Sequence, residues 1–199
     1  MLSEISIYLQ SIKSFVPEIT DAELVAYSSL LSIKYYPKKD IIIKAGQKQH
    51  EIGFIASGLI RSYFLDKNDN EITVRFHAEN DYAIHYAAFI TEQPSKYNFI
   101  ALEPTSVVNI SFDNMHKAYN SLPSIQKFGR LIAEEVIKTQ QYKIESLLFL
   151  SSEERYLEFI KYYPKLYNRI SLSHLSSYLG IERQTLTRIR QKISGKKGK

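Results

Sequence analysis

The first 33 residues have apolar positions spaced as in helices. Pro17 interrupts this stretch, and the segment from Thr20 to Glu23 supplies a capping hydroxyl followed by acids, as at a helix start. Beyond that start, apolar residues recur at helical spacing, at Leu24, Tyr27, Leu30 and Leu31. We therefore expect two short helices before the character of the chain changes.

From Tyr35 onward, short apolar runs alternate with turn residues. In the clearest run, Ile72, Val74 and Phe76 alternate with polar residues, which is typical of a strand with one buried face. The other runs are residues 41–43, 52–55, 59–65, 97–102 and 107–110. Several short strands at even spacing predict a small β-sandwich or barrel.

Helical spacing resumes near Ser111, and the stretch from Ser124 to Leu150 contains no proline. One face of this stretch is apolar, at Ile125, Phe128, Ile132 and Val136. A helix of this length spans roughly 40 Å. Such a helix extends beyond a small β-domain, so we expect it to pair with a second copy of the chain. Three positions interrupt the heptad pattern on the extended seam: Glu135, Thr139 and Tyr142.

A further helix is predicted directly after this stretch. Ser151 and Glu154 have the spacing of a capping box, and Pro164 ends the helical pattern. We place a domain boundary near Leu150.

The segment from Ile170 contains two helical patterns joined by a short turn. Ser171 can cap the first helix, and Gly180 stands where a helix ends with positive φ. The apolar face of this first helix consists of Leu172, Leu175 and Leu179. The second helix runs from about Glu182 to Ile193. Two helices joined by a turn with one glycine are typical of a helix-turn-helix.

The second helix separates into two faces when successive residues turn by about 100°. Leu186, Ile189 and Ile193 cluster on one face. The opposite face carries Gln184, Thr187, Arg188 and Gln191, and Arg183 lies on the flank in the first turn. The first face predicts packing on the preceding helix, and the second predicts a polar surface.

The residue types on the polar face suit DNA. An Arg guanidinium can donate two hydrogen bonds to guanine, and a Gln amide can pair with adenine. We therefore assign Arg183, Gln184 and Arg188 as base-reading residues. Further DNA-contact candidates are Ser171, Thr185 and Thr187, as phosphate contacts, and Gln191.

The distribution of charge agrees with this assignment. Eight Lys and Arg residues but a single acid, Glu182, lie between Arg169 and Lys199, whereas the whole chain has a net charge of only +5. A basic end on a near-neutral body indicates a polyanionic partner. We attribute this role to Arg183, Arg188, Arg190 and Lys192, and interpret the final SGKKGK as a solvated tail.

Several functional classes are disfavoured by what the sequence lacks. With no cysteine, the chain offers no disulfide and no thiolate ligand for a metal or an iron–sulfur cluster. We find no Walker loop, Rossmann fingerprint, H-E-x-x-H or G-x-S-x-G motif, so we do not expect an enzyme. The start of the chain lacks the pattern of a signal peptide, and the longest apolar run is Tyr86–Ile90. We expect a cytoplasmic protein without a membrane span.

Two C-terminal motifs, SSEERYLEFI and LSSYLGIERQTLTRIRQKI, closely resemble the DNA-binding end of Crp/Fnr transcription regulators. Upstream, PKKDIIIKAGQ and IGFIASGLIRSYF resemble the first strands of a cyclic-nucleotide-binding β-roll, and Asp81-Tyr82 resembles the G-D-F that precedes its ligand cassette. The resemblance covers nearly the whole chain, in the order of the family.

This resemblance implies an α+β fold in three parts. Residues 1–123 would form a double-stranded β-helix, a jelly-roll-like sensor with flanking helices. Residues 124–150 would form the dimerisation helix, and residues 151–199 a winged helix-turn-helix. The family implies a homodimer on palindromic double-stranded DNA, with recognition helices about 34 Å apart, and RNA polymerase is a candidate partner. Arg183, Gln184 and Arg188 fall at the family's base-contacting positions, the middle of which is commonly Glu.

The cyclic-nucleotide pocket of the family departs most from its pattern here. A G-E pair and a later R-[ST] pair bind the ribose and the cyclic phosphate, but the aligned residues are Ile84-His85 and Ser95-Lys96. Lys96 can supply charge but lacks the two-pronged geometry of Arg. We therefore do not expect cyclic AMP to bind. If the roll is correct, its cavity would be lined by Tyr82, His85, Tyr86, Ser95, Lys96 and Tyr97.

The effector stays open among three alternatives: an unknown small molecule, no ligand in a cavity filled by aromatic side chains, or a cyclic-AMP-binding interaction module of the same fold. A haem or metal sensor needs ligands that the sequence does not group. His77 and His85 are eight positions apart, and no third ligand is obvious. We expect no resident cofactor.

Overall fold

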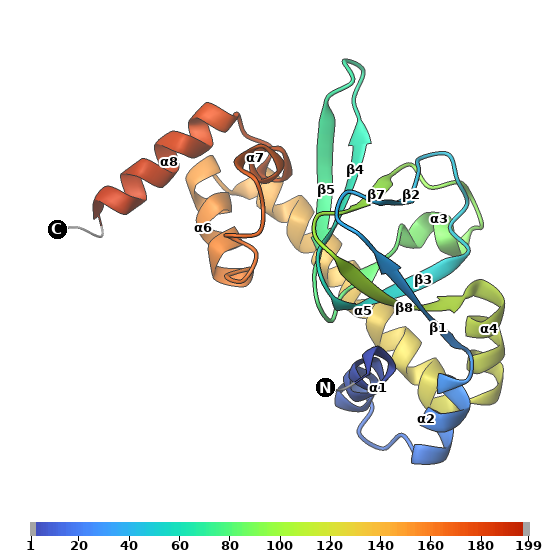
Figure 1. Ribbon diagram of the computed structural model, residues 1–199. Helices are drawn as coiled ribbons and strands as arrows, with labels where there is room; N and C mark the ends of the chain where they lie inside the picture. The colour runs from blue at the N-terminus through green and yellow to red at the C-terminus, as the bar shows by residue number, and fades with distance from the viewer. Residues whose placement is uncertain (1–2, 197–199) are drawn as a thin grey trace. The chain divides into compact units, whose positions relative to one another are not determined.

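The computed structural model describes residues 3–196, so Lys197 to Lys199 of the predicted tail lie outside the described residues. The chain forms two compact units. One comprises Met1–Phe64 and Arg75–Val136, and the other comprises Leu65–Val74 and Ile137–Lys199. Figure 1 shows the elements of each.

The first unit begins with helices α1 (Glu4–Phe15) and α2 (Asp21–Ser28). The Ser3 hydroxyl caps α1, and Thr20 and Glu23 form a capping box at the start of α2. Strand β1 (Leu31–Tyr36) then begins earlier than the sequence predicts, because Leu31 pairs with Ile110 of a distant strand. Tertiary pairing therefore overrides the helical spacing of these last residues.

Two four-stranded sheets build the roll. The first has the order β1-β8-β3-β6, with β8 at Thr105–Ser111, β3 at Glu51–Ser57 and β6 at Tyr82–Ala83. The second has the order β2-β7-β4-β5, with strands at Ile41–Ile43, Asn98–Ala101, Ile60–Leu65 and Glu71–His77. Buried side chains from both sheets form one inner core: Ile55, Ile60, Ala83, Phe99 and Val107. The predicted β-rich domain is thus a roll of two facing sheets.

A second core lies between the first sheet and the helices of this unit, which include α4 (Phe112–Ser121) and the start of α5 (Pro123–Phe149). Tyr8 of α1 stacks on Phe54 of β3 with ring centroids 4.5 Å apart. Ile125 and Phe128 of α5 are buried in the same core. The apolar face predicted for the long helix therefore begins by packing on its own unit.

The short helix α3 (Tyr86–Ile90) and strand β6 have no counterpart among the predicted elements. Both are too short for a periodic pattern to appear. Strand β6 instead forms because Tyr82 and Ala83 pair with Phe54 and Gly53 of β3.

A buried histidine gives the first unit a pH-dependent stability. His77 is 2% exposed, its Nε2 lies 3.0 Å from the Ser62 hydroxyl, and its Nδ1 has no hydrogen-bond partner. Burial lowers the pKa of His77 to about 4. Between pH 6.5 and 4 the unfolded chain therefore takes up a proton that the folded chain does not. We expect the free energy of unfolding to fall over this range by about 2–3 kcal/mol, as urea titrations followed by circular dichroism would measure.

The matched pair of variants for this experiment is His77→Gln and His116→Gln, because His116 lies on the exposed face of α4. The first substitution should remove most of this acid sensitivity, and the second should retain it. Equal slopes in both variants would contradict the assignment to His77.

The second unit contains the end of α5, then α6 (Ser152–Tyr162), α7 (Leu172–Leu179) and α8 (Arg183–Lys196), together with the tip of the β4–β5 hairpin. Ser151 and Glu154 form the predicted capping box. The Ser177 hydroxyl of α7 accepts a hydrogen bond from the Thr73 N–H and donates one to the Glu71 carbonyl. Between α6 and α7 the chain forms turns, and the described residues of this unit after α5 contain no strand that could form a wing.

Candidate nucleic-acid interface and cavities of the roll

Helices α7 and α8 form the predicted helix-turn-helix. The Ser171 hydroxyl accepts a hydrogen bond from the His174 N–H and caps α7. Gly180 ends α7 in the left-handed conformation, with φ 66°. Leu175 and Leu179 of α7 are buried, as is Leu186 of α8. The apolar faces predicted from the sequence thus fix the two helices against each other.

The polar face of α8 is exposed in its own unit. Its exposed residues are Arg183, Gln184, Thr187, Arg188 and Gln191. Thr185 is half-buried, and the Thr187 hydroxyl donates to the Arg183 carbonyl one turn earlier. Among the described residues, the guanidinium groups of Arg183 and Arg188 form no ion pair. Both remain available to a partner molecule.

Two other basic residues of α8 have structural contacts that the sequence did not reveal. Arg190 lies over the Tyr167 ring, 4.8 Å from its centroid, and is only half-exposed. Lys192 forms an ion pair with Glu153 of α6 at 2.6 Å. Arg183 and Arg188 therefore differ from Arg190 and Lys192, whose cationic groups already contact other side chains of the unit.

Two cations anchor the end of α7, and neither was predicted. Arg155 of α6 donates from Nε to the Leu179 carbonyl at 2.9 Å and from Nη1 to the Leu150 carbonyl at 2.7 Å. Lys143 of α5 donates to the Tyr178 carbonyl and lies over the Tyr178 ring. Burial, followed by the charge of Arg155, lowers the pKa of Lys143 to about 8. These contacts satisfy carbonyls that a helix C-terminus leaves without partners.

Four of the six residues predicted for an effector pocket do lie together, and they contact one another. The His85 Nδ1 lies 3.2 Å from the Ser95 hydroxyl and accepts from the Lys96 backbone N–H at 3.3 Å. The Tyr97 ring packs on the imidazole with centroids 4.3 Å apart. Burial, with a smaller effect of the Lys96 charge, lowers the pKa of His85, which favours the neutral acceptor form. The His85 imidazole therefore fills the space between the Ser95 hydroxyl, the Lys96 N–H and the Tyr97 ring.

Tyr82 and Tyr86 do not join this cluster. They line a separate cavity of about 40 Å³ beside α5, together with Tyr8, Tyr27 and Tyr119. Successive residues of a strand point to opposite faces, so Tyr82 and Ala83 of β6 lie on opposite sides of the first sheet. The Tyr82 hydroxyl is buried without a hydrogen-bond partner. The single pocket predicted from the sequence is thus divided between two sites.

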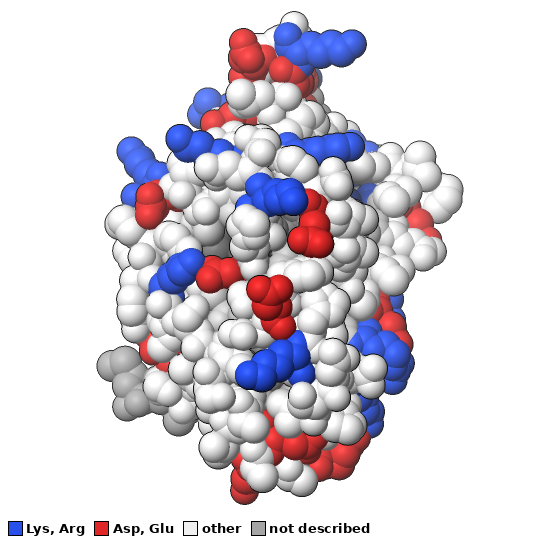
Figure 2. Space-filling model, turned by 90° about the vertical axis from the view of Figure 1, so that its right-hand side faces the viewer, with Lys and Arg blue, Asp and Glu red and all other residues white. Residues whose placement is uncertain are grey.

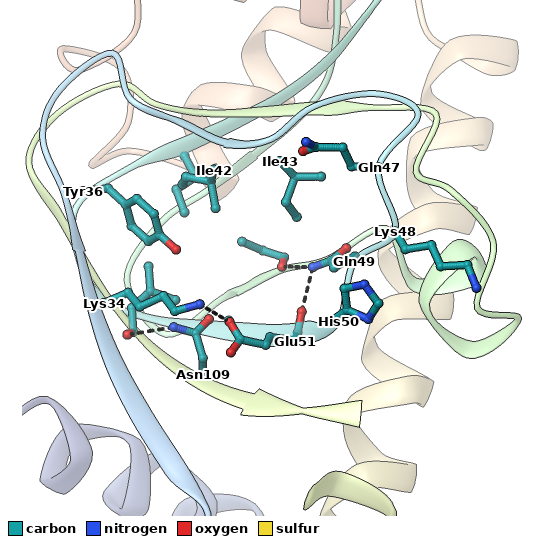
Figure 3. Close-up of a pocket in the computed structure, with 14 residues that line it drawn as sticks. Lys34, Tyr36, Ile42, Ile43, Gln47, Lys48, Gln49, His50, Glu51 and Asn109 are labelled. Carbon is teal, nitrogen blue, oxygen red and sulfur yellow. Dashed lines mark hydrogen bonds and ion pairs between the residues drawn. The ribbon is translucent and has the colours of Figure 1, made fainter. Parts of the chain in front are cut away.

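A larger cavity of about 140 Å³ lies inside the roll. Figure 3 shows Ile42 and Ile43 on one side of it and the Lys34–Glu51 ion pair on the other. The Gln49 amide, 8% exposed, donates to the Glu51 and Ala83 carbonyls and accepts from the His85 N–H. None of the six predicted pocket residues lines this cavity. No sequence pattern indicated this cavity, because its lining comes from strands far apart in the chain.

Other features of the structure bear on partners and cofactors. On the face drawn in Figure 2, Lys and Arg side chains alternate with Asp and Glu, and neither sign forms one broad patch. No group of three His, Asp or Glu side chains within residues 3–196 is placed to share a metal ion. No helix in the described part of the chain combines the length and apolar character needed to cross a membrane.

Known proteins resemble both the sequence and the fold. The cyclic nucleotide-binding domain family matches residues 33–121. The anaerobic regulatory protein of Haemophilus influenzae is 29% identical over 164 residues, which cover 76% of this chain and 63% of that protein. The regulatory protein HlyX of Actinobacillus pleuropneumoniae is 25% identical, covering 86% of this chain and 75% of that protein. The chain thus spans less than two thirds of the length of the first of these relatives.

Among solved structures, FixK2 from Bradyrhizobium japonicum has the same fold, with a TM-score of 0.72. It shares 17% sequence identity, and the match covers 83% of this chain and 85% of that one. Residues 33–121 thus match the cyclic nucleotide-binding domain family, the chain is similar in sequence to bacterial regulatory proteins, and it shares its fold with FixK2.

Proposed function

We propose that the chain is a sequence-specific DNA-binding transcription regulator that acts as a homodimer on a palindromic operator. The observation that carries this proposal is the exposed face of α8. Buried Leu186 fixes the helix in its unit, while Arg183, Gln184 and Arg188 project from the other side. This arrangement supports insertion of α8 into the major groove, where the N-terminal residues of a recognition helix reach the bases.

Each exposed side chain has a defined role in the proposal. Arg183 and Arg188 donate paired hydrogen bonds to guanine, and Gln184 pairs with adenine. Ser171, Thr185, Thr187 and Gln191 complete the contact set, mainly to the phosphate backbone. The Thr187 hydroxyl can still accept a hydrogen bond while it donates to the Arg183 carbonyl.

Helix α5 supports the homodimer. In the second unit it exposes Ile137, Ile144 and Leu148, which are 63%, 58% and 71% accessible. Their separations of seven and four residues are those of a coiled-coil seam. Ile125 and Phe128, at the start of the helix, are buried in the first unit. We therefore place the dimer contact in the C-terminal half of α5, at the three exposed residues.

We also propose that the chain is divided into three functional parts. Residues 1–123 sense, residues 124–150 dimerise and residues 151–199 bind DNA. The proposal places the protein in the cytoplasm, with RNA polymerase as a further partner and no catalytic activity. The imidazole of His85, held by Ser95 and the Lys96 N–H, argues against cyclic AMP at the family's usual position, because that position already has an occupant.

Selection from random duplex DNA tests the proposal. The purified protein should enrich a palindrome whose half-sites are one helical turn apart, about 34–36 Å. Enrichment of no sequence, together with binding that depends only on salt, would instead indicate a general polyanion binder.

The two arginines of α8 should account for much of the specificity. Arg183→Ala and Arg188→Ala are each expected to weaken binding to the selected site by about 1–3 kcal/mol, because each substitution removes a charged, two-pronged contact to a base. Fluorescence anisotropy with a labelled duplex measures this loss.

Arg130→Ala is the matched control. Arg130 is an exposed arginine of α5, and both it and its ion-pair partner Glu134 belong to the first unit, which does not contain α8. That variant should bind as wild type does. If Arg183→Ala and Arg188→Ala also bind as wild type does, the assigned base readers are wrong.

A further inference from the structure

The cavity inside the roll combines one charged wall with one apolar wall (Figure 3). We propose that it binds a small zwitterion with an apolar body, the chemistry of an apolar amino acid. This inference rests on the proposed function, because it names the class of effector that such a regulator would sense.

The charged wall is an ion pair between neighbouring strands. The Lys34 ammonium of β1 lies 2.6 Å from the Glu51 carboxylate of β3, and the two side chains are 47% and 33% exposed. A ligand with only a negative charge would compete with Glu51 for Lys34. A ligand with both charges offers a carboxylate to Lys34 and an ammonium to Glu51, and leaves no charge without a partner.

Among the described lysines and arginines, only Lys34 and Lys48 line the cavity, and His50 borders it as well. Lys48 borders it, but Figure 3 shows its side chain extending away from the space enclosed by the walls. The ion pair of Lys34 and Glu51 carries no net charge, because one side chain is positive and the other negative. This balance favours a ligand without net charge over a phosphate or a nucleotide.

The opposite wall suits an aliphatic body. It is formed by Ile42 and Ile43 of β2, with Ile60 and Val107 deeper in the roll. The space of about 140 Å³ is close to that of a cavity of ~150 Å³ known to hold benzene. An amino acid with a branched side chain of about four carbons has a volume of the same order.

Gly53 lies in the cavity wall, where its lack of a side chain lets Val107 and Asn109 pack closely against the backbone. A Cβ at this position would lie 2.6 Å from Val107 Cγ1 and 3.0 Å from Asn109 Oδ1. Beside it, Gln49 uses both ends of its amide on backbone groups, so it acts as a rigid wall. Its bond to the His85 N–H joins this wall to the cluster at the neighbouring site, which gives an occupant a route to the rest of the sensor.

Calorimetric titration of the full chain tests the inference with L-leucine, L-valine and L-methionine as probes. At least one should bind saturably at submillimolar concentration. Isocaproate, which lacks the ammonium of leucine, and leucinamide, which lacks its carboxylate, should each bind about tenfold more weakly or worse, because each leaves one charge of the pair unmatched. Cyclic AMP should give no saturable heat.

Variants locate the site. Lys34→Met and Glu51→Gln preserve shape at half-exposed positions and should each weaken the best probe by about tenfold. Lys117→Met, an exposed lysine of α4 away from the cavity, should not. No binding by any of the three amino acids, equal binding of isocaproate, or indifference to both variants would overturn the inference. Selection of an operator by the same preparation would then show that the proposed DNA binding stands independently.

Discussion

Replacing Leu186 with alanine is expected to lower the free energy of local unfolding of α7 and α8 by about 2–5 kcal/mol, because a fully buried leucine leaves a cavity behind. Leu186 is 0% exposed, and Leu175 and Leu179 of α7 are buried in the same unit. Amide hydrogen exchange followed by mass spectrometry measures this change in peptides from α7 and α8 of the intact chain. We expect loss of operator binding to accompany the loss of protection, since the exposed face depends on this packing.

Gln191→Ala is the control for this experiment, because Gln191 lies on the exposed face of the same helix. Its effect on stability should stay within about 0.5 kcal/mol. Unchanged protection in Leu186→Ala would show that α8 does not depend on the buried face.

Replacing Gly58 with alanine should destabilise the roll by about 3–5 kcal/mol, through strain at positive φ added to steric overlap. Gly58 has φ 104° in the turn between β3 and β4. A Cβ there would lie 2.6 Å from Thr105 Cα and 2.7 Å from the Pro104 carbonyl oxygen. Both are backbone atoms, so no side-chain rotation relieves the overlap. Urea unfolding followed by circular dichroism gives the difference.

Gly46→Ala separates the two causes. Gly46 also has positive φ, at 87°, but nothing lies within 4 Å of its added Cβ. We expect a loss of about 1–2 kcal/mol there, from backbone strain alone. Equal losses in the two variants would mean that the close approach of Thr105 contributes nothing.

The helix-turn-helix could be predicted from sequence because its signals are local. The periodicity of Leu186 and Ile189, the capping hydroxyl of Ser171 and the glycine at 180 all act within a turn or two of themselves. The structure places each where its pattern predicts. The same holds for the capping boxes at the starts of α2 and α6.

The parts that could not be predicted depend on contacts between distant segments. Pairing of Leu31 with Ile110 decides where β1 begins. The face of the first sheet to which Tyr82 of β6 points decides that it lines the cavity beside α5. Arg155 and Lys143 reach carbonyls more than twenty residues away. The cavity of the roll is defined by Lys34, Glu51 and Val107, which no periodic pattern connects.

The base preference at Gln184 tests the central claim most directly, that α8 reads DNA. A Gln amide both donates and accepts, whereas Glu only accepts and prefers the amino group of cytosine. Selection from random duplexes should be repeated with Gln184→Glu. We predict that one symmetric pair of positions in the palindrome changes, toward cytosine, while the remaining positions keep their bases. An unchanged consensus at every position would contradict the account, because Gln184 would then not contact a base.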